Sequence, residues 1–214
     1  MKTNITEIVF ILDRSGSMAG LESDTVGGYN AMLEKQKGAP GEAVVTTVLF
    51  DDRYELLHDR ANVKSISLIT EKEYFVRGST ALLDAIGSTI QKISNAQKHV
   101  APAYRADKVI VVITTDGMEN ASREYSPAQI KEMIKQKQKK CGWEFIFLGA
   151  NIDAVSTAKE YGIPGSRAAN YRADSKGTSL NYRVVGDAIC EMRASTKLAD
   201  DWKADIEEYH ESQQ

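Results

Sequence analysis

Three separate segments of this sequence carry clustered oxygen-bearing side chains, and the first of them contains Asp13, Ser15 and Ser17. These residues follow directly on the apolar run at 8–12, which is typical of a strand buried on both faces. One carboxylate and two hydroxyls, without histidine or cysteine, suit a hard cation such as Mg²⁺ or Mn²⁺. Taken alone, the segment is about as typical of a polar turn in which Asp or Ser caps the next helix.

Asp116 closes a second segment of the same form. It stands in the run Thr114-Thr115-Asp116-Gly117, directly after a second β-branched stretch at 108–113. Ligands of open α/β sheets bind at the carboxyl ends of the strands. If the two apolar runs form parallel neighbouring strands, Asp13 and Asp116 leave the sheet at the same edge.

The third segment is Gly78-Ser79-Thr80. It immediately precedes residues 81–96, whose apolar side chains recur at helical spacing. Thr80 would add a third hydroxyl to the set. On its own, however, this segment favours a simpler interpretation, in which Ser79 or Thr80 caps the helix.

Charged residues near these segments also have simpler interpretations. Arg14 and Arg77 flank two of the segments and would attract an acidic ligand, but ordinary surface arginines are the favoured interpretation. Asp51 and Asp52 are adjacent carboxylates in the turn of an expected hairpin, and this position favours a structural role.

Strands and helices are expected to alternate along the chain. The pattern predicts a doubly wound α/β fold of Rossmann-like type: a mostly parallel central sheet with one antiparallel edge strand and helices on both faces. The expected strands are 5–12, 43–50, 54–58, 108–113, 143–148 and 168–171, and the expected helices are 22–37, 81–96, 126–140, 153–161 and 175–193.

Composition limits the function further. The 214 residues carry a net charge of −3 without a dense basic run, which argues against nucleic acid as the main ligand. The run at 8–12 is too short for a membrane span and lacks the features of a signal peptide. Cys141 and Cys190 lie far apart and are typical of free thiols in a reducing compartment. We therefore expect a cytoplasmic protein that binds neither nucleic acid nor membrane.

Together, the three segments resemble the metal-ion-dependent adhesion site (MIDAS) of von Willebrand factor type A domains, of the kind that stands nearly alone in some bacterial and phage proteins. Asp13-Arg14-Ser15-Gly16-Ser17 matches the family motif Asp-x-Ser-x-Ser, Thr80 matches its loop threonine and Asp116 its third element, in the family's order. The resemblance implies a von Willebrand factor type A domain over residues 1–195. A charged tail at 196–214 follows, which we expect to be helical.

The resemblance also implies a function. Ser15, Ser17 and Thr80 would bind Mg²⁺ through their hydroxyls, with Mn²⁺ or Ca²⁺ as alternative ions. Asp13 and Asp116 would act on the ion directly or through water. A carboxylate from an Asp or Glu of a partner protein would complete the coordination. The implied function is a metal-dependent protein-binding module, not an enzyme.

Two other functions compete with this one. A metal-dependent phosphohydrolase with Asp13 as nucleophile would want a second Asp two positions further on, where this chain has Ser15. Metal hydrolases also usually supply more carboxylates or histidines, whereas His58, His99 and His210 lie outside the three segments. The other alternative is a purely structural domain with an empty site, whose stability would not respond to Mg²⁺ or Mn²⁺.

Overall fold

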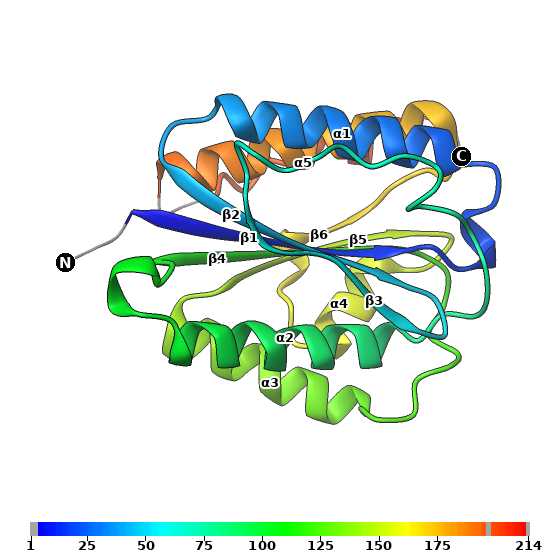
Figure 1. Ribbon diagram of the computed structural model, residues 1–214. Helices are drawn as coiled ribbons and strands as arrows, with labels where there is room; N and C mark the ends of the chain where they lie inside the picture. Colours follow the sequence, from blue (N-terminus) through cyan, green and yellow to red (C-terminus); the bar gives the residue numbers. More distant parts are fainter. Residues whose placement is uncertain (1–3, 196–197, 213–214) are drawn as a thin grey trace.

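The computed structural model describes residues 4–195 and 198–212, and within them the chain forms a six-stranded sheet in the order β3-β2-β1-β4-β5-β6 (Figure 1). Only the β2–β3 pair is antiparallel among these residues. The expected mostly parallel sheet with one antiparallel edge strand is therefore confirmed. The strands are β1 (Ile5–Asp13), β2 (Glu42–Phe50), β3 (Tyr54–Asn62), β4 (Lys108–Asp116), β5 (Glu144–Ala150) and β6 (Ala168–Asn170).

Helices cover both faces of this sheet, as the sequence predicts. Figure 1 shows α1 and α5 on one face and α2, α3 and α4 on the other. The helices are α1 (Glu22–Gly38), α2 (Leu82–His99), α3 (Pro127–Cys141), α4 (Ala154–Glu160), α5 (Ser175–Ala194) and α6 (Ala204–Glu211).

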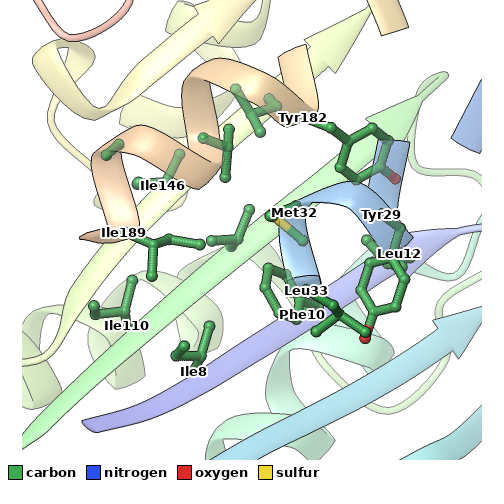
Figure 2. Close-up of a cluster of buried hydrophobic side chains, with 14 of the residues drawn as sticks. Ile8, Phe10, Leu12, Tyr29, Met32, Leu33, Ile110, Ile146, Tyr182 and Ile189 are labelled. Atoms are coloured by element: carbon green, nitrogen blue, oxygen red, sulfur yellow. The ribbon is translucent and has the colours of Figure 1, made fainter. Parts of the chain in front are cut away.

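Strand β1 separates two hydrophobic cores. Ile8, Phe10 and Leu12 pack against α1 and α5, in the cluster that Figure 2 shows. Val9 and Ile11 point to the opposite face and pack against α2 and its neighbours. A strand between two helical layers needs apolar side chains at every position. This requirement explains the uninterrupted apolar run, and it leaves the polar residues to the point where the strand ends.

The start of α2 differs from the sequence expectation. Neither Ser79 nor Thr80 caps this helix, which begins at Leu82. Its N–H groups bond instead to the loop after β4: Leu83 N donates to Glu119 Oε2 at 3.0 Å, and Asp84 N donates to Ser122 Oγ at 3.1 Å. Distant side chains therefore satisfy the helix terminus, and the hydroxyl of Thr80 is not used as a cap.

The tail packs against the domain through α6, which contacts α5 and β6. Ile206 is buried, and Trp202 Nε1 donates to the carbonyl of Ser166 at 2.8 Å. The tail thereby helps to cover the short edge strand β6, an arrangement that protects an open sheet edge. Residues 1–3 of the expected domain, and 196–197 and 213–214 of the expected tail, lie outside the described residues.

The helices of the described residues are too short or too polar to cross a lipid bilayer.

Candidate metal site

The parallel register of β1 and β4 brings Asp13 and Asp116 to the same edge of the sheet. Leu12 lies opposite Thr114 in this register, so Asp13 emerges beside Thr115. Thr115 Oγ1 donates to Asp13 Oδ2 at 2.6 Å, and the backbone N–H of Asp116 approaches the same oxygen at 3.4 Å. The two strand ends are thus joined through the carboxylate of Asp13.

Asp13 also shapes the turn that carries the two serines. Its Oδ1 accepts a hydrogen bond from the backbone N–H of Ser15 at 2.7 Å, an Asx-type turn that reverses the chain directly after the strand. The short 3-10 turn Gly16–Met18 follows. It brings the Oγ atoms of Ser15 and Ser17 to 3.0 Å from one another. Ser15 is buried, whereas Ser17 lies at the surface.

Gly117, the residue after Asp116, lies close to Ser17 and Thr80. A Cβ atom built on Gly117 would lie 3.1 Å from Ser17 Oγ and 3.9 Å from Thr80 Oγ1. The residue directly after Asp116 is therefore within contact distance of both hydroxyl-bearing loops. Any side chain larger than hydrogen at this position would fill the space that the hydroxyls share.

The backbone holds the Thr80 loop against the serine loop. Gly16 N donates to the carbonyl of Gly78 at 3.2 Å. On its other side, Thr80 N donates to Asn120 Oδ1 at 2.9 Å, and Asn120 N returns a bond to the Thr80 carbonyl at 3.0 Å. The structure thus brings the five residues that the sequence selects to one edge of the sheet, although the sequence places them in three segments.

The two carboxylates of this cluster are buried without a positive side chain. Asp13 and Asp116 are each 1% exposed. Neither takes part in an ion pair among the described residues. Burial raises the pKa of Asp13, and burial together with the nearby charge of Asp13 raises the pKa of Asp116. Negative charge is therefore concentrated here and lacks a cationic partner from these parts of the chain.

This donor set fits a hard divalent ion. Within the described residues, no three His, Cys, Asp or Glu side chains form a group that could hold a metal. A site here depends on hydroxyls as much as on carboxylates. Hard divalent cations prefer oxygen ligands, so two carboxylates and three hydroxyls are a donor set of the kind that such an ion takes.

Asn151 is a contributor that the sequence analysis missed. Its side chain donates to Asp116 Oδ1 and is the main polar contact that opposes the rise in the pKa of Asp116. It follows directly on β5, the neighbour of β4. The rule that selects Asp13 and Asp116, a polar residue after a buried strand, would have selected Asn151 as well.

The expectation of ordinary surface arginines is wrong for Arg14. Its side chain is fully buried and bonds to Asp51 and Glu55. Arg77 is 35% exposed in its side chain and also bonds to Asp51. The sequence gives no hint of this arrangement, because the partners come from the turn between β2 and β3 and from the start of β3.

Comparisons with solved structures identify the class of fold. No protein-family model matches this chain, and no curated protein matches it. Among solved structures, the vWF domain of the pili tip protein Mfa5 from Porphyromonas gingivalis matches with a TM-score of 0.61 at 10% identity, covering 91% of this chain and 98% of that one. Manganese-loaded TRAP from Plasmodium vivax matches with a TM-score of 0.57 at 17% identity, over 84% and 73%.

Proximal thread matrix protein 1 from the mussel byssus, in a structure with a zinc-occupied MIDAS motif, matches with a TM-score of 0.58 at 17% identity. The alignment covers 86% of this chain and 46% of the mussel protein, so the chain spans about half of that protein's length. The fold is an α/β sandwich of the Rossmann-like class. More narrowly, this chain has the von Willebrand factor type A fold, as its sequence resemblance predicts.

Proposed function

We propose that this chain is a divalent-metal-dependent protein-binding module, which captures an acidic residue of a partner protein through Mg²⁺ at the carboxyl edge of the sheet. One observation carries the proposal. Two buried carboxylates without a cationic partner among the described residues lie beside three hydroxyls that converge from two loops. Such a cluster is costly unless a cation joins it.

The residues that would hold the ion are Ser15, Ser17 and Thr80 through their hydroxyls, and Asp13 and Asp116 directly or through water. Bound Mg²⁺ would supply positive charge and a coordination position for a ligand oxygen. Neutral hydroxyls leave much of that charge uncompensated, and this favours a carboxylate as the ligand. Mn²⁺ and Ca²⁺ have the same preference for oxygen and are alternative ions.

Two of the similar structures support a divalent metal in a protein of this fold. The mussel protein has a zinc-occupied MIDAS motif, and the Plasmodium protein is manganese-loaded. At 17% identity these likenesses establish the fold, so the ion and its ligands in this chain remain part of the proposal.

The geometry does not favour the phosphohydrolase alternative. Both carboxylate oxygens of Asp13 accept hydrogen bonds, Oδ1 from Ser15 N and Oδ2 from Thr115 Oγ1. A nucleophilic oxygen needs an open approach, whereas Asp13 is 1% exposed. These contacts suit a residue that shapes the site and holds its charge.

The proposed setting is the cytoplasm, with a protein as the partner rather than nucleic acid or a membrane surface. Cys141 and Cys190 are both free thiols, which suits a reducing compartment. The net charge of −3 does not suit a nucleic-acid ligand.

Affinity capture with the whole chain tests the proposal. We expect a partner from a cytoplasmic extract to be retained in Mg²⁺ buffer, released by EDTA, and not retained by Asp13→Ala. Asp59→Ala is the matched control, because it removes an exposed carboxylate on β3 that pairs with Lys92. Retention of the partner by Asp13→Ala in EDTA would contradict the proposal.

A further inference from the structure

We infer that Asp51 is a positioning residue of the proposed metal site, which holds the serine loop (residues 14–17) and the threonine loop (residues 77–80) at the spacing that a small divalent ion requires. The inference rests on the proposed function. Asp51 lies in the turn between β2 and β3, and it would act through Arg14 and Arg77 rather than by touching the ion.

The carboxylate of Asp51 joins the two loops. It is fully buried, and its Oδ2 accepts hydrogen bonds from Arg14 Nε at 3.0 Å and from Arg77 Nε at 2.6 Å. Arg14 is the residue between Asp13 and Ser15, and Arg77 lies three residues before Thr80. Oδ1 accepts from the backbone of Arg53 at 2.8 Å, which fixes the orientation of the carboxylate.

Backbone bonds connect the same two loops to the same turn. Arg14 N donates to the carbonyl of Phe50, and Ala81 N donates to the carbonyl of Asp51, each at 2.8 Å. The loops also meet directly, since Arg77 N donates to the carbonyl of Arg14 at 2.9 Å. The end of β2 and Asp51 are thus bonded to the first residue of the serine loop and to Ala81, which directly follows the threonine loop.

The surroundings of Arg14 make its position sensitive to Asp51. The Arg14 guanidinium is fully buried, and its other carboxylate contact is Glu55 Oε2 at 2.6 Å. Its Nη1 has no hydrogen-bond partner among the described residues. The ring of Phe75 lies 5.3 Å from Arg14 Cζ and 5.4 Å from Arg77 Cζ, so it contacts both guanidinium groups.

Removal of the Asp51 charge would therefore loosen both loops. A buried guanidinium that loses one carboxylate partner moves toward water or toward the partner that is left. Arg14 carries the backbone between Asp13 and Ser15, so its movement displaces Ser15 and Ser17 relative to Thr80. Mg²⁺ and Mn²⁺ need closely spaced ligands, whereas Ca²⁺ accepts longer and less regular coordination.

Titration calorimetry on the whole chain tests this role, with Mn²⁺ and Ca²⁺ as probes. We expect Asp51→Asn to bind Mn²⁺ about tenfold more weakly than the wild type, in the range known for residues that orient metal ligands. Affinity for Ca²⁺ should fall by a smaller factor, so the ratio of the two affinities changes. A merely structural role would lower both affinities by the same factor, through the folded fraction.

Asp59→Asn is the matched control, since it removes the same charge from an exposed residue of β3 that pairs with Lys92, away from both loops. We expect it to keep the wild-type affinities and their ratio. Equal losses in Asp51→Asn and Asp59→Asn, or an unchanged ratio in Asp51→Asn, would overturn the inference. Arg77→Gln, at a partly exposed position, is a second variant that should fold and show a weaker loss of the same kind.

The proposed function and this inference fail in different ways. A wild-type chain that binds no Mn²⁺ contradicts the proposed function, and the inference falls with it. A wild-type chain that binds Mn²⁺ while Asp51→Asn and Arg77→Gln bind it equally well contradicts the inference alone.

Discussion

The two ends of β1 each carry a buried carboxylate, and these two carboxylates have different hydrogen-bonding and charged partners. Glu7, near the amino end, is 0% exposed and Asp13, at the carboxyl end, is 1% exposed. Burial raises the pKa of both. Glu7 has a cationic partner, Arg60, whose Nε lies 3.1 Å from Glu7 Oε1, and a hydrogen bond from Gln97.

Among the described residues, the donors to Asp13 are neutral: the N–H groups of Ser15 and Asp116 and the hydroxyl of Thr115. The part of the chain that the structure describes thus supplies a counter-charge at one end of the strand and none at the other. A buried charge that serves structure is compensated within the fold. At the carboxyl end, the described residues do not neutralise the buried carboxylates, and a site for an exchangeable cation requires such uncompensated negative charge.

The largest expected effect on stability comes from removing Arg60, the cationic partner of Glu7. Arg60→Met would leave Glu7 buried without its partner, and loss of one member of a buried pair costs about 3 kcal/mol. Urea denaturation should show this loss equally with and without Mg²⁺. Arg183→Met is the control, because it breaks an exposed pair with Asp205 and should change stability little. A loss in Arg60→Met no larger than in this control would contradict the comparison.

The next effect concerns the uncompensated end. Asp13→Asn removes the buried charge but also replaces one of two acceptor oxygens by an N–H donor. These two changes oppose one another, so in EDTA the variant should be about as stable as the wild type. Saturation of the wild type with Mg²⁺ at a hundred times Kd should add about 2.7 kcal/mol, and the variant should gain none of it. Thermal unfolding in the two buffers measures both quantities. Glu7→Gln should be stabilised by Mg²⁺ as much as the wild type is. If Mg²⁺ stabilised Asp13→Asn equally, the proposed difference between the two ends of β1 would be refuted.

A smaller effect is expected from a single hydroxyl. Thr80→Ala removes one proposed ligand of the ion and should weaken Mn²⁺ binding about tenfold, equivalent to about 1.4 kcal/mol. Thr80→Ser keeps the hydroxyl and should bind nearly as well as the wild type. Calorimetric titration with Mn²⁺ distinguishes the two variants. Equal affinity of Thr80→Ala and the wild type would remove Thr80 from the site.

The smallest expected effect is a dependence on pH. Since burial raises the pKa of Asp13 and Asp116, their carboxyls in the folded, metal-free protein keep protons that the unfolded chain has already released. Their contribution to the stability of the metal-free protein therefore falls as the pH rises from about 4 through the raised pKa values.

A divalent ion competes with these protons. The stabilisation by Mg²⁺ should therefore increase as the pH rises from about 4 through the raised pKa values of Asp13 and Asp116. Thermal shifts with and without Mg²⁺ across this range provide the measurement, and Asp13→Asn should show little of the increase. A shift that is constant across the range would mean that these carboxylates do not face the ion.

Much of the fold follows from the sequence because the core strands are buried on both faces. Val9 and Ile11 pack in one hydrophobic core and Phe10 in the other, so the strand is an unbroken apolar run in the sequence. The site follows from the same logic, since parallel neighbouring strands place Asp13 and Asp116 at one edge. These inferences need only local patterns and one rule of sheet geometry.

The missed features depend on contacts between distant segments. The cap of α2 comes from Glu119 and Ser122, more than thirty residues away along the chain, so the local Ser79 and Thr80 were a misleading signal. The sequence favours a surface position for Arg14, whereas in the structure Arg14 is buried against Asp51 of the β2–β3 turn. Neither pairing leaves a trace in spacing or hydrophobic period, because each depends on how loops meet after the sheet has formed.

The most direct test of the metal site is an anomalous difference map from crystals of the whole chain grown in Mn²⁺. We predict one strong peak within bonding distance of the hydroxyl oxygens of Ser15 and Ser17, with Thr80, Asp13 and Asp116 around it. A map with no peak there, at Mn²⁺ concentrations that saturate oxygen-ligand sites, would contradict the central claim that this uncompensated edge of the sheet holds a cation.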